Sequence, residues 1–254
     1  MNLNFLKPTI LLVIILISGL SNAQVSDIKR KVRSDTKSSS YSTQSRTSYN
    51  RSSDDDYLMT EIANGIASCV AWASIEAQRN VLQNENRYPN TVSLEAILDY
   101  GTNLSELTLN PTLRGNWGIY ASELRYHVLH DYTGSLESLD WQVLILRVPI
   151  RNFKANYGIG FTSLFSPQTT YAESSTGFDL CLLERKLKLT ANYRWTFRRN
   201  SERYRQEFKF TADYLMMQKG NFHLSPIIGV TYQNYFNEDE FWFFNCGVRL
   251  RFGR

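Results

Sequence analysis

Apolar and polar residues alternate with a period of two through most of the chain after residue 91. The segment 153–161, FKANYGIGF, has aromatic or aliphatic residues at its odd positions and polar or small residues at its even positions. Successive side chains of a β-strand point to opposite faces of the sheet, so this alternation predicts a strand. The pattern recurs in about ten segments of roughly 9–13 residues, the length that a tilted strand needs to cross a bilayer. The segments are 92–100, 107–114, 120–128, 138–150, 153–161, 174–183, 187–197, 208–216, 222–233 and 244–252.

The connections between these segments are alternately short and long. Short connections fall around Asn116 and at 151–152, 183–186 and 218–221, whereas HDYTGSLES, FSPQTTYAESS, RRNSERYRQ and NYFNEDE are predicted to be longer polar loops. Outer-membrane barrels alternate short periplasmic turns with longer extracellular loops in this way. Pro111 and Pro226 interrupt two of the segments. Because Pro cannot donate to a strand ladder, we expect a bulge or a strand end at one or both.

The two faces of the predicted strands differ in chemistry. The apolar faces carry no charge, and Arg or Lys there would cost ~2–4 kcal/mol at the middle of a bilayer. Aromatic residues gather toward the segment ends, for example Trp195, Phe197 and Phe208, while central positions such as Leu189 are aliphatic. This distribution is typical of the aromatic girdles at membrane interfaces. The pattern therefore favours a barrel with lipid outside and polar groups inside.

Over residues 91–254 the chain resembles the small outer-membrane β-barrel proteins of Gram-negative bacteria. The resemblance implies an all-β fold, an antiparallel up-and-down transmembrane barrel of about ten strands, with eight strands as the alternative because the first segment is the weakest. It also implies an outer-membrane location, with membrane lipid and the barrel assembly machinery as partners. In this class a C-terminal aromatic residue serves as the assembly signal. Phe252 is the candidate here, although Gly253 and Arg254 follow it.

Three segments precede the predicted barrel. Residues 1–23 are predicted to be a signal peptide, because Lys7, the apolar run TILLVIILISGL and the small residues SNA follow one another in the expected order. Residues 24–56 are rich in Ser and charged residues, and we expect a disordered linker on the periplasmic side. Residues 57–83 carry apolar residues at helical spacing and predict an amphipathic helix. That helix either packs against the fold or plugs the barrel.

Composition excludes several functions. The net charge is +4 in 254 residues, which gives no basic field for binding nucleic acid. The three Cys and three His residues match no zinc spacing, so we predict no metal site and no cofactor. The glycines of GIG at 158–160 do not form a phosphate loop, and we interpret them as space for long side chains opposite.

The charged faces of the predicted strands form the main candidate site. A salt-bridged polar interior is the first interpretation, because a barrel of eight to ten strands leaves little room beyond its own side chains. A narrow, weakly anion-preferring channel is the alternative, because cations outnumber anions in the set. The lumen-facing candidates are Arg114, Arg125, Lys154, Lys188, Arg194, Lys209, Arg249, Arg251, Glu95, Asp99, Glu123 and Asp213.

The stretch HVLHD at 127–131 is the best candidate for catalysis, since His130 and Asp131 are adjacent in sequence. Some outer-membrane barrels are hydrolases that use such pairs. The spacing is not diagnostic, so we predict no catalytic residue and keep a membrane-embedded hydrolase as an alternative. The sequence favours a structural or partner-interaction role, with a periplasmic or surface protein as the partner.

Overall fold

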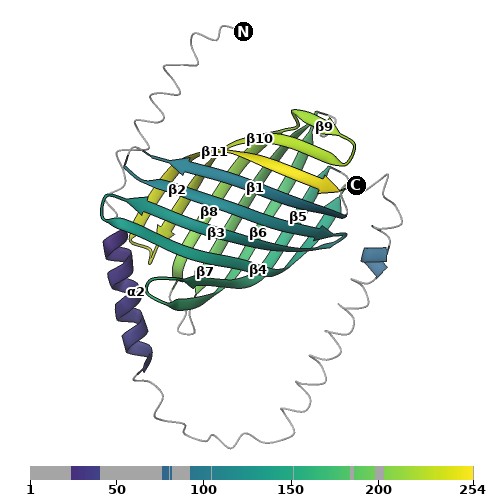
Figure 1. Ribbon diagram of the computed structural model, residues 1–254. Helices are drawn as coiled ribbons and strands as arrows, with labels where there is room; N and C mark the ends of the chain where they lie inside the picture. The colour runs from purple at the N-terminus through teal and green to yellow at the C-terminus, as the bar shows by residue number, and fades with distance from the viewer. Residues whose placement is uncertain are drawn as a thin grey trace, which may run out of the picture.

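The computed structural model describes residues 24–40, 76–79, 81, 92–103, 105–150, 152–183, 186–197 and 203–253. In this part of the chain, a 16-residue helix and eleven strands are formed, labelled as in Figure 1, and residues 76–79 and 81 are also helical. The helix is α2 (Val25–Ser40). The strands are β1 (Val92–Thr102), β2 (Leu107–Trp117), β3 (Tyr120–Asp131), β4 (Gly134–Ile150), β5 (Phe153–Leu164), β6 (Thr169–Leu182), β7 (Leu187–Phe197), β8 (Arg203–Tyr214), β9 (Met217–Lys219), β10 (Phe222–Tyr235) and β11 (Asp239–Gly253).

The strands close into an antiparallel up-and-down barrel. Each of β1 to β7 pairs with the next strand, β8 pairs with β10, and β10 pairs with β11. The barrel closes where β11 pairs with β1, from Ser93 opposite Gly253 to Thr102 opposite Phe244. The short strand β9 pairs with the start of β10 and stands outside the ring, which therefore has ten strands in the described chain. The fold predicted from the alternation is confirmed, with ten strands rather than eight.

Three of the four predicted long loops are wrong, because the strands continue through them; the fourth, between β7 and β8, lies partly outside the described residues. Tyr132 and Thr133 alone separate β3 from β4, and residues 165–168 and 236–238 make the corresponding connections between β5 and β6 and between β10 and β11. The polar residues of these stretches belong to paired strands; His130, for example, lies opposite Ser135. They are polar because they line a polar interior or the barrel rim, and not because they form loops. β4 reaches 17 residues as a result.

Neither strand proline makes the expected bulge or strand end: Pro111 lies within β2 and Pro226 within β10, each at a position where the pairing to one neighbouring strand is interrupted. Between β2 and β3 the pairing passes from Leu109 opposite Val128 to Thr112 opposite Arg125, leaving Pro111 out of the ladder. Pro226 precedes Ile227, the residue at which β10 begins to pair with β8, and follows the part that pairs with β9. The missing donor of each Pro therefore falls at a gap in the pairing.

The barrel is apolar outside and charged inside. In β1, Leu94 and Leu98 are exposed while Glu95 and Asp99 are buried, and the other strands alternate in the same sense. A barrel in water would have the opposite arrangement, because burial of apolar surface drives folding there. Among the helices that the structure describes, none is long and apolar enough to cross a membrane.

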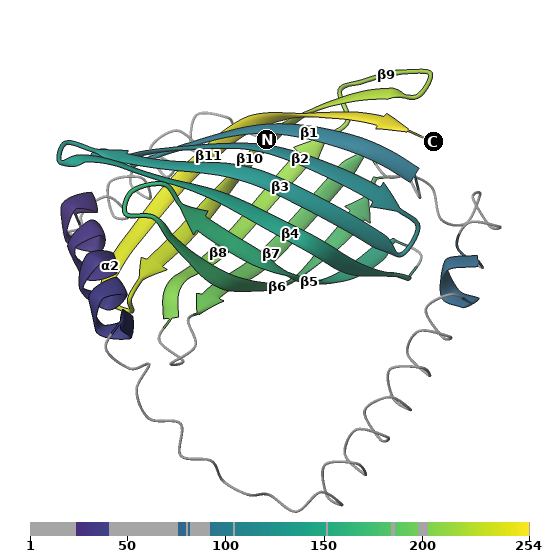
Figure 2. The ribbon, with the colours of Figure 1, turned by 60° about the horizontal axis from the view of Figure 1, so that its bottom comes forward.

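The helix α2 corrects the prediction of a disordered linker over 24–56. Residues 25–40 are helical and cover one open end of the barrel, beside the β3–β4 turn (Figures 1 and 2). Val25, Ile28 and Val32 recur at helical spacing and are completely buried. The low apolar content of the segment gave no sign of this helix. The helix is ordered because one stripe of three apolar side chains is buried, and so few residues barely change the composition. Residues 41–56 and the predicted signal peptide, residues 1–23, lie outside the described residues.

The predicted helix over 57–83 is described only at residues 76–79 and 81, which are helical. The side chain of Gln78 donates to the carbonyl of Trp117 at 3.0 Å and accepts from the amide of Ile119 at 2.7 Å. These contacts lie at the β2–β3 turn, where Gly118 has a φ of 62°. This turn is at the barrel end where β1 starts and β11 finishes, opposite the end that carries α2.

Candidate functional site: the barrel interior

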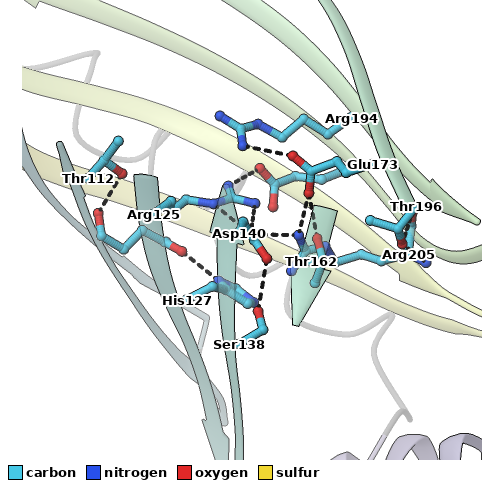
Figure 3. A network of polar contacts seen from close by, with 12 residues as sticks. Thr112, Arg125, His127, Ser138, Asp140, Thr162, Glu173, Arg194, Thr196 and Arg205 are labelled. Atoms are coloured by element: carbon cyan, nitrogen blue, oxygen red, sulfur yellow. Dashed lines mark hydrogen bonds and ion pairs between the residues drawn. The ribbon is translucent and has the colours of Figure 1, made fainter. Parts of the chain in front are cut away.

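A network of buried ion pairs occupies the middle of the barrel interior, and Asp140 of β4 is its centre (Figure 3). The Asp140 carboxylate accepts hydrogen bonds from Arg125 Nε at 3.0 Å and Arg125 Nη2 at 2.6 Å. It also accepts from Arg205 Nη2 at 2.7 Å and from Ser138 Oγ at 3.1 Å. Asp140 is completely buried, so each of these donors replaces a water molecule that the carboxylate would otherwise bind.

Several of these ion pairs join strands that are not neighbours in the barrel wall. Arg125 of β3 contacts Glu207 of β8, with 2.5 Å between Nη1 and Oε1. Arg194 of β7 pairs with Glu123 of β3. Because β3 is separated from β7 and from β8 by several strands in either direction, these side chains cross the interior. The walls of the barrel are therefore linked through the lumen as well as around it.

Glu173 of β6 is a second buried carboxylate in the network. It pairs with Arg194 Nη1 at 3.2 Å and Arg205 Nη2 at 3.3 Å. It also accepts from Thr162 Oγ1 at 2.7 Å and Gln142 Nε2 at 2.8 Å. A Cβ added at Gly158 would lie 2.2 Å from the Gln142 side-chain oxygen. The glycine therefore makes room for a long side chain opposite, as its position in GIG predicted.

An apolar layer lies between this network and α2. Val25, Ile28 and Val32 of the helix pack against a cup of barrel side chains, all at most 2% exposed. Tyr171 and Tyr204 stack in this cup with their ring centroids 4.4 Å apart. The residues of the cup are Leu129, Leu136, Leu164, Tyr171, Tyr204, Tyr235, Phe241 and Phe243.

Polar contacts fix α2 at the rim of the barrel. The amide of Val25 donates to Asp131 Oδ2 at 2.8 Å, which satisfies a free N–H of the first helical turn. Lys31 Nζ lies 2.7 Å from Glu238 and 2.8 Å from Asp239, in the β10–β11 connection and at the start of β11. Partial burial lowers the pKa of Lys31, but the hydrogen bonds to Asp239 and Glu238 outweigh it, so the pKa is raised above 10.5.

A second group of charges lies at the opposite end of the interior. Arg249 pairs with Asp213 at 2.5 Å, and Arg251 pairs with Glu95 at 3.1 Å. Lys188 pairs with Asp179 at 3.2 Å. Within the described chain, Lys154 and Arg147 have no ion pair. A cavity of about 70 Å³ lies between these groups and the central network and is lined by Arg114, Lys188, Arg249 and neighbouring polar side chains.

The predicted lumen set is brought together on these two levels. Arg125, Arg194, Lys209, Glu123 and Asp99 belong to the central network, where Lys209 pairs with Asp99. The end group contains the remaining predicted residues, Arg114, Lys154, Lys188, Arg249, Arg251, Glu95 and Asp213. Phe252, the predicted assembly signal, is exposed on the outer surface near the end of β11.

Sequence reasoning missed six charged residues of the interior, for identifiable reasons. Glu173, Arg205 and Glu207 lie in or beside stretches read as loops, although each continues the alternation of its strand. A β-bulge between Trp141 and Leu144 shifts the alternation of β4. This shift concealed Asp140 on one side of the bulge and Arg147 on the other. The sixth missed residue is Asp179 of β6.

The additional residues change the charge balance. The predicted set had eight cations and four anions, which motivated an anion-preferring channel. Four of the missed residues are carboxylates and two are cations, so the described interior between the apolar cup and the far end holds ten cations and eight anions. The excess of cations that favoured anion conduction is therefore small over the whole interior.

The structure does not bring His130 and Asp131 together as a catalytic pair. His130 is exposed, while Asp131 is buried on the other face of β3 and caps the β3–β4 turn and α2. His127 is buried between Asn110, with 2.5 Å from Nδ1 to Oδ1, and the hydroxyl of Tyr235 at 3.2 Å from Nε2. No group of His, Cys, Asp and Glu suited to a metal ion is present among the described residues.

No protein-family model and no curated protein matches the sequence. Among solved structures, the N-terminal β-barrel domain of Pseudomonas aeruginosa OprF is similar, with a TM-score of 0.33 and 10% identity over 64% of this chain and 98% of that chain. The porin NanC is similar with a TM-score of 0.38 and 8% identity, over 63% of this chain and 100% of that chain. At these scores the likeness carries no functional argument, so function has to follow from the surfaces of the barrel itself.

Proposed function

We propose that this protein is an integral outer-membrane β-barrel with a closed interior, and that it has a structural or partner-interaction role rather than a transport role. The observation that carries this proposal is the set of buried ion pairs that cross the interior between non-neighbouring strands, with Arg125–Glu207 as the clearest. The outer surface supports the membrane location, and α2 supports closure.

The outer surface of the barrel suits lipid. Leu98 of β1 is 56% exposed and Ile228 of β10 is 66% exposed, in the middle of their strands. Soluble monomers rarely expose a continuous apolar patch larger than about a few hundred Å². Here the exposed apolar residues occur on every strand of the ring in the described chain. In water this surface would cost roughly 25 cal/mol per Å², and in hydrocarbon it costs nothing.

The interior opposes free passage of solutes. A path through the barrel would have to separate Arg125 from Glu207 or Arg194 from Glu123, and these side chains are at most 8% exposed. Breaking a buried ion pair costs about 3–5 kcal/mol when one charge is left without a partner. A solute would also have to displace α2, which fills one mouth with three completely buried side chains. A constitutively open channel does not fit this arrangement.

The outward face of α2 is the surface that a partner would meet. Arg30 is 78% exposed at its side chain and makes its ion pair only to Asp27 of the same helix among the described residues. The barrel thus holds a short basic helix at a fixed place on the rim. In this proposal the barrel is an anchor, and α2 and the adjoining turns carry the contact with a periplasmic or surface protein.

Two measurements test the proposal. Cell fractionation should recover the protein in the outer membrane, with heat-modifiable mobility on a gel as expected for a folded barrel. Recovery in the soluble periplasm without heat-modifiable mobility would contradict the membrane assignment. A photo-crosslinking residue at Arg30 should then capture a protein that the same residue at Lys219, on β9 at the other end, does not. Equal capture at both positions, or at neither, would contradict a role for α2 in partner binding.

A further inference from the structure

The end of the interior opposite α2 carries more cations than its carboxylates can neutralise. We call this group the basic end; it consists of Arg114, Arg147, Lys154, Lys188, Arg249 and Arg251. Among the described residues, three carboxylates lie within it, Glu95, Asp179 and Asp213, and Glu123 is shared with Arg194 of the central network. The small excess of cations over the whole interior is therefore concentrated at this end.

Arg147 of β4 forms no ion pair with a carboxylate among the described residues. It is only 6% exposed, and its Nε and Nη1 are buried with no hydrogen-bond partner in the described chain. Arg205 and Arg249 each have one such nitrogen, but both hold close ion pairs with carboxylates. A buried guanidinium with two free donors and no close ion pair is costly, so such a group in a native structure indicates a further partner.

Lys154 stands beside Arg147 on the inner face. Arg147 lies opposite Asn156 in the β4–β5 ladder, and Lys154 is two residues from Asn156, so the two cations are diagonal neighbours. Neighbouring cations of the basic end repel both side chains. Arg114 repels the Arg147 guanidinium, and Arg147 and Lys188 repel the Lys154 ammonium. The side-chain oxygen of Asn156 is also buried without a partner in the described structure. That oxygen is an acceptor and does not bind an anion, so the anion-binding groups of this position are the two cations alone.

The chemistry of a matching ligand follows from these donors. A guanidinium presents parallel N–H groups that suit two oxygens of one anion, and an ammonium beside it adds a point charge. A tetrahedral oxyanion with up to two negative charges offers enough oxygens for the donors of Arg147 and Lys154. A cavity of about 70 Å³, lined by Arg114, Lys188 and Arg249 but not by Arg147 or Lys154, shows that side chains do not completely fill the interior at the basic end.

We propose that the basic end binds a phosphate group, with Arg147 donating two hydrogen bonds and Lys154 supplying a second positive charge. The ligand is either inorganic phosphate or the phosphate of a small ester that enters from the end where β1 starts. It is held and not conducted, because the central ion pairs and α2 close the way beyond it. The site is separate from α2 and does not depend on the proposed partner role.

The experiment uses the full mature chain, purified as a folded barrel in detergent micelles. Thermal unfolding is followed while inorganic phosphate replaces chloride at constant ionic strength and pH, and the phosphorus NMR linewidth of the free anion is recorded in parallel. We expect a saturable rise in Tm and a broadened phosphate resonance. A Tm that depends on ionic strength alone, with chloride as effective as phosphate, would overturn the proposal.

Two variants of the site and one control locate the binding. Arg147→Met and Lys154→Met should each weaken the apparent affinity for phosphate at least tenfold, whereas Lys219→Gln, on the exposed strand β9, should leave it unchanged. Without phosphate, Arg147→Met should be at least as stable as the wild type, because it removes a buried charge without a partner. A merely structural Arg147 would make this variant less stable with and without phosphate alike.

The same titration identifies the source of the phosphate group. Glycerol 3-phosphate that binds as tightly as inorganic phosphate points to an ester as the ligand, and its exclusion points to the free ion. Either result supports a phosphate site as long as it depends on Arg147. Phosphate binding that persists unchanged in the folded Arg147→Met variant would contradict the site.

Discussion

Replacing Asp140 with Asn removes one charge from the centre of the ion-pair network without changing the shape of the side chain. In the wild type, Asp140 accepts two hydrogen bonds from Arg125 and one from Arg205, at 2.6–3.0 Å. An amide cannot neutralise two guanidinium groups, and its NH2 would face their donors. Arg125 would keep Glu207, but Arg205 would keep only Glu173 at 3.3 Å.

The expected cost of Asp140→Asn is about 3–5 kcal/mol of unfolding free energy, the range for removing one partner from a buried ion pair. Glu137→Gln is the matched control, because Glu137 lies three residues earlier in β4, is only part-buried, and accepts hydrogen bonds only from the hydroxyls of Tyr126 at 2.7 Å and Ser135 at 3.4 Å among the described side chains. Its expected cost is about 1 kcal/mol or less. Both variants lose a carboxylate. The difference between their unfolding free energies therefore measures the contribution of burial and of pairing across the barrel.

Urea unfolding of the barrel in phospholipid vesicles, followed by Trp fluorescence, measures both costs. With a urea dependence of about 1–3 kcal/mol per molar, the midpoint of Asp140→Asn should fall by roughly 1–3 M. The double variant Asp140→Asn with Arg205→Gln should lose less than the sum of the two single variants, because it removes the charge that the first change leaves unpaired. If Asp140→Asn shifts the midpoint no more than Glu137→Gln, the network does not hold the barrel together as described.

Three further predictions concern α2. Ile28→Asp places a charge in the apolar cup and should release the helix, so trypsin should cleave α2 at least tenfold faster than in Ser34→Asp, whose side chain is exposed; equal rates would contradict the docking. Because the pKa of Lys31 is raised in the folded state, its ion pairs should stabilise the docked helix fully at neutral pH and lose effect only as pH rises above about 10.5. A spin label at Arg33→Cys should therefore gain mobility in that alkaline range and not between pH 7 and 9, and the gain should be absent in Lys31→Met. In intact cells a membrane-impermeant maleimide should reach only one of Arg30→Cys and Lys219→Cys, since the two lie at opposite ends of the barrel, and labelling of both from the same side would contradict either the membrane span or the position of α2.

The alternation of apolar and polar residues along the chain predicted the barrel well, because the outer face of each strand is apolar and the inner face is polar. Leu94 and Leu98 in β1, or Tyr157 and Ile159 in β5, lie outward where the period placed them. The strand ends were harder to predict, since inward polar residues such as Glu173 and Arg205 look like loop residues when the outward neighbours are also polar. Hairpins as short as Tyr132-Thr133 give no composition signal of their own.

The candidate site was only partly predictable because it depends on contacts across the barrel. Sequence pattern placed Arg125 and Glu123 on an inner face, but the pairing of Arg125 with Glu207 depends on how many strands separate β3 from β8. The bulge between Trp141 and Leu144 reverses the alternation in β4. The alternation of inward and outward residues before the bulge therefore does not predict that Arg147, which follows it, faces inward. The docking of α2 depends on the cup formed by distant residues such as Tyr171 and Phe243, which no local pattern reveals.

The central claim is that the barrel crosses the membrane with its interior closed. Single-channel recording in planar lipid bilayers tests it directly, with the wild type compared under the same conditions with Ile28→Asp combined with Asp140→Asn, which opens both the α2 seal and the central network. The account predicts no discrete openings for the wild type at low voltage, and small openings for the combined variant. Steady discrete conductance of the wild-type protein would contradict the closed interior and favour a narrow channel.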